Sequence, residues 1–417
     1  MKKIGLVYSL ILFIAIPFRA SAQWVIINPQ PQNNSLFKVQ LVSNTIGWAV
    51  GDQGTIIKTS DGGANWIQQN SGITKALFGV SFVNENFGTA VGDAGTILNT
   101  TDGGTHWNLQ PSGTINEFEN VYFSDVNIGT AVGYDTTIIK TNDGGANWSF
   151  QHSGLTIPYD FYDVFFTDAI NGIILCGNGT FLKTTDGGIN WNIQSLGIYN
   201  RLLSIRFYDA NIGYIVAEGG AIFNTTDGGN IWNSQISGVT SALFGVSCPN
   251  SNIATIVGWG GRILNTTNGG LDWGLQTSNT ESSLYSVSFS DSLHGIAVGQ
   301  NGIMLRTTNG GVTLIEDEEN NFAQPKEFLL QQNYPNPFNP STKISWQSPV
   351  GSWQTLKVYD ILGNEVATLV NEYRNAANYE VEFNVGRDSS PALASGIYFY
   401  KIQIGDFVET KKMILLK

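Results

Sequence analysis

Short apolar runs separated by glycine-containing turns recur along most of the chain. Between Leu77 and Trp107 the runs LFGVSFV, TAVG and TILNT are rich in β-branched and aromatic residues, and the turns NENFG, DAG and TDGG separate them. The last turn leads into a further strand that opens with Trp107. The pattern predicts a unit of four short antiparallel strands.

This unit recurs at a nearly constant interval. Its Asp-Gly-Gly or Asn-Gly-Gly turn occurs seven times, at spacings of 41, 41, 43, 41, 41 and 41 residues, and begins at Asp61, Asp102, Asp143, Asp186, Asp227, Asn268 and Asn309. A repeat of this length with four strands per unit is typical of a β-propeller with one blade per repeat. We therefore expect an all-β fold in which residues 23–314 form a seven-bladed β-propeller.

The innermost strand of each repeat is apolar at alternate positions. One position holds Val39, Val80, Val121, Val164, Ile205, Val246 and Val287, and the position two residues later holds Leu41, Phe82, Phe123, Phe166, Phe207, Cys248 and Phe289. Alternate residues of a strand share one face. We expect both positions to pack between neighbouring blades.

The Asp-Gly-Gly-x-x-Trp turn has a structural reason at each residue. The short polar side chain can accept the backbone N–H two residues on, and glycine adopts a positive φ at little cost. The tryptophan is expected to cover the outer edge of the blade. Asparagine replaces aspartate in the last two copies, which a hydrogen-bond acceptor tolerates and an acid or base does not. We therefore interpret the seven turn residues as structural.

The tryptophans indicate how the ring closes. In the first six copies a tryptophan stands five residues after the Asp or Asn of the turn, but the seventh copy has Leu314 there. Trp24 stands 42 residues before Trp66, at the head of the run WVII. We expect residues 24–27 to pair with residues 302–307 and complete the last blade, which removes an open sheet edge.

The first 22 residues have the pattern of a signal peptide. Two lysines precede an apolar stretch from Ile4 to Phe18, and the small residues from Ala20 to Ala22 fit a cleavage site. No cysteine lies near that site, so we expect no lipoprotein anchor, and no later segment is long and apolar enough to span a bilayer. The pattern predicts export through the periplasm.

Composition narrows the range of partners. The net charge of −12 and the isoelectric point of about 4.7 argue against nucleic-acid or anionic-membrane binding. Cys176 and Cys248 fall in blades four and six, which are not adjacent, so no disulfide is expected. The histidines show no ligand spacing, at His106, His152 and His294. We expect no metal and no cofactor.

The repeat stops after Thr313 and the composition changes. Residues 315–326 are acidic and polar and contain a proline, which is typical of a linker. Residues 327–417 contain alternating apolar runs with turn signals between them. They predict a small immunoglobulin-like antiparallel β-sandwich.

Four motifs in this second domain resemble a known export signal. They are NYPNPFNPSTKISW (333–346), VYDILGNEV (358–366), SGIYFYKI (395–402) and a final strand with Lys411 and Lys412. Together they look like the type A C-terminal sorting domain of the type IX secretion system. The resemblance implies recognition by the type IX machinery at the outer membrane, removal by a sortase-like peptidase and attachment of the passenger to surface lipopolysaccharide. It implies a secreted or surface-attached protein.

The propeller repeats also resemble known families. The segment IGWAVGDQGTIIKTSDGGANW (46–66) is similar to repeats of the photosystem II stability and assembly factors, and TDGGxxW is the Asp-box of the bacterial neuraminidase repeat. The resemblance implies the propeller architecture. The photosystem factors carry an arginine-rich patch, whereas the arginines of this propeller are only Arg201, Arg206, Arg262 and Arg306.

Two variable positions suggest where a ligand would bind. In an up-and-down blade the Asp-box turns lie on one face, and the turns between second and third strands lie on the other with the blade-to-blade crossings. On that second face one position holds Asp52, Asp93, Tyr134, Gly177, Glu218, Trp259 and Gln300, and another holds Ser35, Ala76, Glu117, Asp160, Arg201, Ala242 and Ser283. The architecture does not fix these residues, so they are free to serve binding or to drift as solvated loops. The candidate ligand-binding residues are Asp52, Asp93, Tyr134, Glu218, Trp259, Gln300, Glu117, Asp160 and Arg201.

Three functions are compatible with these features. The first is a monomeric, non-catalytic propeller that binds a protein or a glycan outside the cell, because no catalytic cluster stands out. The second is a glycoside hydrolase of the sialidase or endoglucanase kind, which needs two carboxylates about 5–10 Å apart and, for a sialidase, clustered arginines. The third, an assembly factor, is implied only by the resemblance to the photosystem propellers.

Overall fold

The computed structural model describes residues 24–27, 32–311, 327–374, 376–386 and 393–416. The chain divides into two compact units, Met1–Leu314 and Ile315–Lys417. The expected signal peptide (1–22) and linker (315–326) lie outside the described residues.

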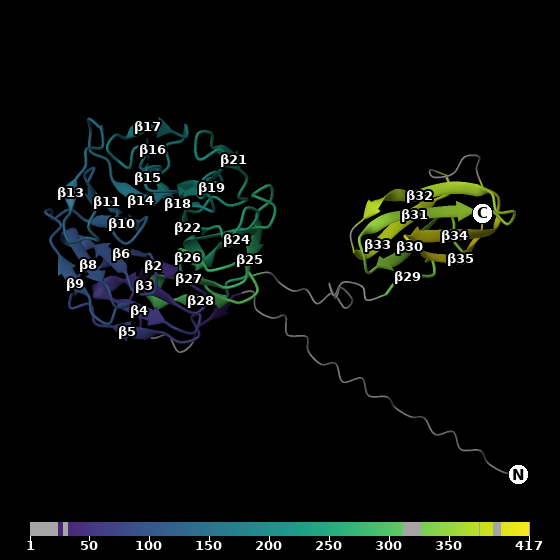
Figure 1. Cartoon of the computed structure of the whole chain (residues 1–417), viewed down its shortest axis with the longest axis horizontal. Coiled ribbons are helices and arrows are strands. Elements are labelled where there is room, and N and C mark those ends of the chain that lie inside the picture. The colour runs from purple at the N-terminus through teal and green to yellow at the C-terminus, as the bar shows by residue number, and fades with distance from the viewer. Residues whose placement is uncertain (1–23, 28–31, 312–326, 375, 387–392, 417) are drawn as a thin grey trace, which may run out of the picture. The chain divides into compact units, whose positions relative to one another are not determined.

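The first unit is a seven-bladed β-propeller, as predicted, and each blade is a four-stranded antiparallel sheet (Figure 1). The seven inner strands, one per blade, contact one another around the ring: β2 (Leu36–Leu41), β6 (Leu77–Phe82), β10 (Phe118–Phe123), β14 (Phe161–Phe166), β18 (Leu202–Phe207), β22 (Leu243–Ser247) and β26 (Leu284–Phe289). The second strands are β3 (Gly47–Gly51), β7 (Gly88–Gly92), β11 (Gly129–Gly133), β15 (Gly172–Cys176), β19 (Gly213–Ala217), β23 (Ala254–Gly258) and β27 (Gly295–Gly299). The third strands are β4 (Ile56–Thr59), β8 (Thr96–Thr100), β12 (Ile138–Thr141), β16 (Thr180–Thr184), β20 (Ile222–Thr225), β24 (Ile263–Thr266) and β28 (Met304–Thr307). The outer strands are β5 (Ile67–Gln69), β9 (Asn108–Gln110), β13 (Ser149–Phe150), β17 (Asn192–Ser195), β21 (Asn233–Gln235), β25 (Gly274–Gln276) and β1 (Val25–Ile26).

The propeller has two distinct faces. The Asp-box face carries the turns between first and second strands and between third and fourth strands. The crossing face carries the connections from one blade to the next and the turns between second and third strands. Five of these last turns are short 3₁₀ segments: η1 (Asp52–Gly54), η2 (Asp93–Gly95), η3 (Glu218–Gly220), η4 (Trp259–Gly261) and η5 (Gln300–Gly302).

The ring closes through the N-terminal strand, and the predicted pairing is confirmed. Val25 lies opposite Arg306 and Ile26 opposite Leu305 in the antiparallel pair of β1 and β28. Trp24 is fully buried, and its indole N–H donates to the side-chain oxygen of Gln276 at 2.8 Å. A tryptophan from one end of the propeller therefore completes the blade built by the other end.

Apolar side chains fill the space between neighbouring blades. The two predicted inner-strand positions are buried in every blade that the structure describes, with one partial exception at Phe289. Polar links add to this packing, because third-strand side chains donate to a glycine carbonyl of the next Asp-box turn. These donors are Lys58 to Gly103 at 3.0 Å, Lys140 to Gly187 at 2.6 Å, Lys183 to Gly228 at 2.9 Å and Arg306 to Gly62 at 2.7 Å.

The Asp-box turn is centred on a buried threonine that the sequence analysis did not single out. In each copy its Oγ1 accepts the amide of the second glycine at 2.8–2.9 Å, from Thr59, Thr100, Thr141, Thr184, Thr225, Thr266 and Thr307. The Asp or Asn side chain instead accepts the amide four residues on in copies one to six, as Asp61 does from Asn65 at 2.8 Å. The predicted bond to the amide two residues on forms only at Asn309, to Gly311 at 3.2 Å, among the turns described. The threonine hydroxyl accepts this amide in all seven copies, because it lies deeper in the turn.

The expected place of the turn tryptophan was wrong. The ring is directed inward and packs edge-on against the inner-strand phenylalanine of its own blade, with centroid distances of 5.9–6.1 Å. The pairs are Trp107 with Phe82, Trp148 with Phe123, Trp191 with Phe166 and Trp232 with Phe207. The tryptophan is thus part of the core and not a cover for the outer edge.

The second unit is an antiparallel β-sandwich. One sheet contains β29 (Leu329–Leu330), β30 (Ser341–Ser348) and β33 (Ala377–Asn384), and the other contains β32 (Glu365–Arg374), β31 (Ser352–Tyr359), β34 (Gly396–Ile404) and β35 (Phe407–Leu415). One hydrophobic core joins the two sheets through Trp346, Phe383, Tyr400 and Met413, all buried. Tyr400 also donates to the carbonyl of Gln331 at 2.7 Å, which ties the start of the unit to its core.

Candidate binding sites in the central channel

The inner strands surround a central channel that contains two cavities. Residues of all seven inner strands line each cavity, one of about 170 Å³ and one of about 410 Å³. Each inner strand begins at the crossing face, so the second residue of each strand lies at that mouth and the fifth residue lies toward the Asp-box face. The 170 Å³ cavity is bounded by second-position residues and the 410 Å³ cavity by fifth-position residues.

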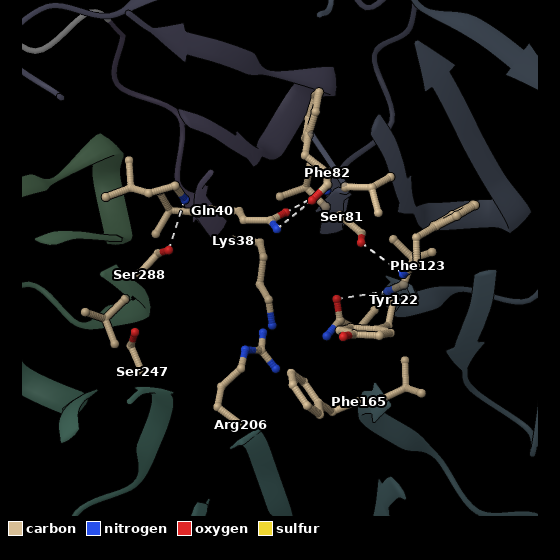
Figure 2. Close-up of a pocket in the computed structure, with 18 of the residues that line it drawn as sticks. Lys38, Gln40, Ser81, Phe82, Tyr122, Phe123, Phe165, Arg206, Ser247 and Ser288 are labelled. Carbon is tan, nitrogen blue, oxygen red and sulfur yellow. Dashed lines mark hydrogen bonds between the residues drawn. The ribbon is translucent and has the colours of Figure 1, made fainter. Parts of the chain in front are cut away.

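An ion cluster separates the two cavities. The Asp163 carboxylate is fully buried and lies 3.0 Å from a guanidinium nitrogen of Arg206 and 3.8 Å from Nζ of Lys38. Figure 2 shows Lys38 and Arg206 extending toward each other from opposite walls. Burial alone would raise the pKa of Asp163, but the two cations and the amide of Ile205 hold it below its usual value. Burial lowers the pKa of Lys38 to about 8, although Asp163 opposes this shift.

Half of the crossing-face mouth is aromatic. The rings of Phe78, Phe37, Tyr285 and Phe244 follow one another along blades two, one, seven and six, with centroid distances of 5.1, 5.7 and 5.6 Å. All four border the 170 Å³ cavity and are partly exposed. We call these four residues the aromatic arc. It provides an apolar wall at the entrance to the channel.

The opposite half of this mouth is acidic. Burial first, then the neighbouring charges of Asp93 and Asp160, raise the pKa of Glu117. Burial and the Glu117 charge raise the pKa of Glu119 to about 7. The Tyr134 hydroxyl interacts with both glutamates, and burial together with these carboxylates raises its pKa. We call Asp93, Glu117, Glu119 and Asp160 the acidic arc.

At blade five, Arg201 lies at the end of the acidic half of the crossing-face mouth. Arg201 donates to Glu218 from Nε at 2.8 Å and from a terminal nitrogen at 2.5 Å, and its guanidinium lies 5.8 Å from the ring centre of Tyr162. The hydrogen bonds to Glu218 and Tyr162 raise the pKa of Arg201. Its charge is therefore largely committed to one carboxylate, and the sector remains net acidic.

The structure brings the two predicted positions together pairwise. In six blades the residue after the second strand donates its amide to the carbonyl before the inner strand at 2.9–3.1 Å, in the pairs Asp52–Ser35, Asp93–Ala76, Tyr134–Glu117, Glu218–Arg201, Trp259–Ala242 and Gln300–Ser283. Six predicted residues gather on blades two to five: Asp93, Glu117, Tyr134, Asp160, Arg201 and Glu218. Asp52, Trp259 and Gln300 lie on the same face but on blades one, six and seven. Of these, Asp52 lies near Tyr285 of the aromatic arc, whose pKa its charge helps to raise after burial.

Sequence reasoning missed the residues that point into the channel. Lys38, Asp163 and Arg206 stand on inner strands, on the face opposite the two apolar positions. The aromatic arc and Glu119 stand at the second strand position, inside the β-bulge between the first and third residues of their strands. A comparison of the third inner-strand position across blades contained the signal, because Lys38 and Asp163 interrupt a series of small or amide residues: Gly79, Asn120, Ser204, Gly245 and Ser286.

Other candidate chemistry is accounted for by local contacts. Cys176 and Cys248 are buried and unbridged, as predicted. His106 and His294 lie beside turn aspartates, at 2.6 Å from Asp102 and 2.9 Å from Asp291. Within the described ranges no group of three His, Cys, Asp or Glu side chains is arranged to hold a metal ion. The described part of the chain likewise contains no helix long and apolar enough to cross a membrane.

Comparisons with known proteins agree with the division into a propeller and a C-terminal domain. The model of the Photosynthesis system II assembly factor YCF48 family matches residues 65–149, 112–185 and 184–276, which together span just over half of the chain. The model of the secretion system C-terminal sorting domain matches residues 332–416. No curated protein matches the chain.

Similar solved structures share the fold. "YCF48 bound to D1 peptide" has 20% identity and a TM-score of 0.60, over 71% of this chain and all of that one. YCF48 from Cyanidioschyzon merolae has 22% identity and a TM-score of 0.59, over 69% of this chain and 98% of that one. The GH74 enzyme of Niastella koreensis has 13% identity and a TM-score of 0.55, over 91% of this chain and 72% of that one.

The sorting domain marks the protein for export by the type IX secretion machinery, to the outer surface or into the medium. The propeller repeats, the matched family model and the shared fold point to one family. The chain belongs to the Photosynthesis system II assembly factor YCF48 family and carries a secretion system C-terminal sorting domain.

Proposed function

We propose that this protein is an exported, non-catalytic propeller that binds a polypeptide segment at the crossing-face mouth of its channel. The segment presents a lysine or arginine next to an apolar side chain. The observation that supports this most is the division of one mouth into an aromatic arc and an acidic arc around a 170 Å³ cavity.

The two arcs suit the two parts of a basic side chain. Lysine and arginine combine an apolar stem with a charged head. The stem would pack on Phe37 and Tyr285, and aromatic faces also attract cations. The head would reach Glu117 and Glu119, whose pKa values are raised by burial. A bound cation would lower these pKa values and gain the Coulomb energy of a partly buried pair.

A polypeptide is preferred to a glycan for two reasons. One solved structure of the same family contains a bound peptide, by its description "YCF48 bound to D1 peptide". The acidic arc also offers carboxylates that would bind a cationic group, and neutral glycans carry no such group. The paired Arg201 and Glu218 at the edge of the mouth would contribute orientation rather than net charge.

The test is a peptide array followed by anisotropy titrations of the purified protein against the best Lys- or Arg-containing peptide. The double variant Asp93→Asn with Glu117→Gln should weaken binding by about tenfold and flatten its salt dependence. Phe78→Ala should weaken binding by a similar factor, about tenfold, without changing the salt dependence. Asp61→Asn on the Asp-box face is the matched control and should bind as wild type. Equal binding of neutral and basic peptides, or unchanged affinity in both mouth variants, would contradict the proposal.

One observation favours a second candidate, a glycoside hydrolase. Glu119 has its pKa raised to about 7 beside the more exposed carboxylates of Glu117 and Asp160. A protonated acid next to an ionised one is the arrangement that glycoside hydrolysis uses. Turnover of aryl-glycosides by the wild type that disappears in Glu119→Gln would establish this candidate and displace the binding proposal.

A further inference from the structure

The 410 Å³ cavity on the Asp-box side of the ion cluster is lined by hydrogen-bond donors (Figure 2). It is separate from the crossing-face mouth, because Lys38, Asp163 and Arg206 lie between them. None of the residues predicted from the sequence as ligand contacts borders it. A volume of 410 Å³ falls in the range of small-molecule sites.

Three serine hydroxyls in this cavity already accept one hydrogen bond each. The Oγ atoms of Ser81, Ser247 and Ser288 accept amides of the next blade at 3.0, 3.1 and 3.0 Å, respectively. These bonds link the blades and occupy one lone pair of each hydroxyl. In the part of the chain that the structure describes, no acceptor faces the three hydroxyl hydrogens. Each hydroxyl is therefore free to donate into the cavity.

Backbone amides add donors on the side of blades four to six. In blades three to five the strand position of the three serines holds Tyr122, Phe165 and Arg206. These side chains accept no amide of the next blade among the described residues. In the other blades the equivalent amides, those of Leu41, Phe123 and Phe289, bond to the serine of the preceding blade. Phe207 and Cys248 occupy this position, line the cavity, and receive no such acceptor from the preceding blade among the described residues. Buried amides without partners are costly, and an oxygen ligand would satisfy them.

The ion cluster at the base of the cavity has more positive than negative charge. Arg206 uses one terminal nitrogen for both Asp163 at 3.0 Å and the carbonyl of Ile205 at 2.5 Å. Its Nε and second terminal nitrogen have no acceptor within the described ranges. Lys38 shares the same carboxylate at 3.8 Å. Two cations thus share one fully buried anion. The charge of Glu119, which also acts on Lys38, lies on the crossing-face side of the cluster. A second anion would balance the cluster.

We propose that this cavity binds the carboxylate of a small organic acid about the size of a monosaccharide, such as a uronic acid. The carboxylate accepts from Arg206, the Ser247 hydroxyl and the amide of Cys248, in the bidentate manner that guanidinium groups favour. The rings of Tyr122 and Phe165, 4.8 Å apart, form the wall on which the body of the ligand packs. Ser81 and Ser288 donate to its remaining oxygens.

Isothermal titration of the purified protein with galacturonate, glucuronate, glucose and sodium sulfate tests this proposal. We expect saturable binding of a sugar acid, and binding of glucose and sulfate at least about tenfold weaker. Sulfate binding as tight as that of both sugar acids would overturn the assignment to a carboxylate ligand. So would the absence of saturable binding by either acid.

Variants then locate the site. Arg206→Gln should weaken binding of the sugar acid by at least about tenfold. Because that change also disturbs Asp163, Ser247→Ala provides a second test and should weaken binding by about threefold or more. Ser286→Ala is its matched control, since Ser286 makes the same kind of inter-blade bond, to Val39 at 3.2 Å, at the level of the other cavity. Unchanged affinity in a folded Ser247→Ala protein, or equal losses in Ser247→Ala and Ser286→Ala, would overturn the proposal.

Discussion

Arg206 donates to the carboxylate of Asp163 at 3.0 Å across the interface of blades four and five, in the middle of the channel. The other carboxylate contacts come from Ser204 and the amides of Ile205 and Val164, all at 3.0 Å, and from Asn120 of blade three. Lys38 of blade one reaches the same group from the far wall. One buried carboxylate therefore joins four blades and divides the channel into two compartments with different chemistry.

Loss of this carboxylate should destabilise the propeller. Asp163→Asn leaves the partly buried Arg206 and Lys38 without their shared carboxylate, and breaking such a cluster costs about 3–5 kcal/mol. Urea unfolding of the purified protein measures the change. Asp125→Asn, an exposed turn residue that accepts two amides, is the control and should be nearly neutral. Equal midpoints for Asp163→Asn and the control would show that the cluster is not a structural centre.

Trp24 of the N-terminal strand should contribute as much to the stability of the propeller as a core residue does. Trp24→Ala removes a fully buried side chain, its bond to Gln276 and its contact with Phe289, and should cost about 3–5 kcal/mol. Val25→Ala in the same strand is the matched control, since Val25 is 57% exposed. A melting temperature for Trp24→Ala equal to that of the control would mean that the ring does not depend on this closure.

In the Asp-box turn the threonine should matter more than the aspartate. Asp61→Asn keeps an acceptor for the amide of Asn65, as Asn268 does for Asp272 at 3.1 Å, so we expect a change within about 0.5 kcal/mol. Thr59→Val leaves the amide of Gly63 buried without its acceptor and should cost about 1–3 kcal/mol. Thermal unfolding of the two variants decides the order, and the reverse order would contradict this account of the turn.

Glu119 should make stability depend on pH. Its pKa is about 7 in the folded protein against the usual 4.5, so the folded state holds a proton that the unfolded state has released. Stability should therefore fall as the pH rises from about 4.5 to about 7. Glu119→Gln cannot ionise and should be more stable than the wild type at pH 8, but similar to it near pH 4.5. Denaturant titrations across this range, with the exposed Glu85→Gln as control, measure the effect. A wild-type slope retained in Glu119→Gln would assign it to other groups.

Much of the fold could be predicted because turn spacing and residue alternation along the sequence determine it. The spacing of the Asp-box turns gave the blade count, and the displaced Trp24 gave the ring closure. The two inner-strand positions were assigned to the core because period-2 alternation determines which residues share a face. The threonine was overlooked because its role depends on how deep its hydroxyl lies in the turn, which spacing does not reveal.

The candidate sites were predictable only in part. Loop positions such as Glu117 and Tyr134 were found because they vary where the repeat allows it. The opposite face of the inner strand, with Lys38 and Asp163, was not considered, and Arg206 was only counted among the arginines of the propeller. These residues meet only because the ring brings blades one, four and five around one axis, and no local pattern records a contact across that axis.

Site-specific photocrosslinking tests the proposed binding of a polypeptide most directly. Benzoylphenylalanine in place of Phe244 puts the probe in the aromatic arc, and in place of Leu271, 84% exposed, it puts the probe on the Asp-box turn of the same blade. With the basic peptide selected on the array, we predict a covalent adduct from the Phe244 position that excess free peptide suppresses, and none from the Leu271 position. An adduct from the Leu271 position alone, or equal adducts from both, would contradict binding at the crossing-face mouth.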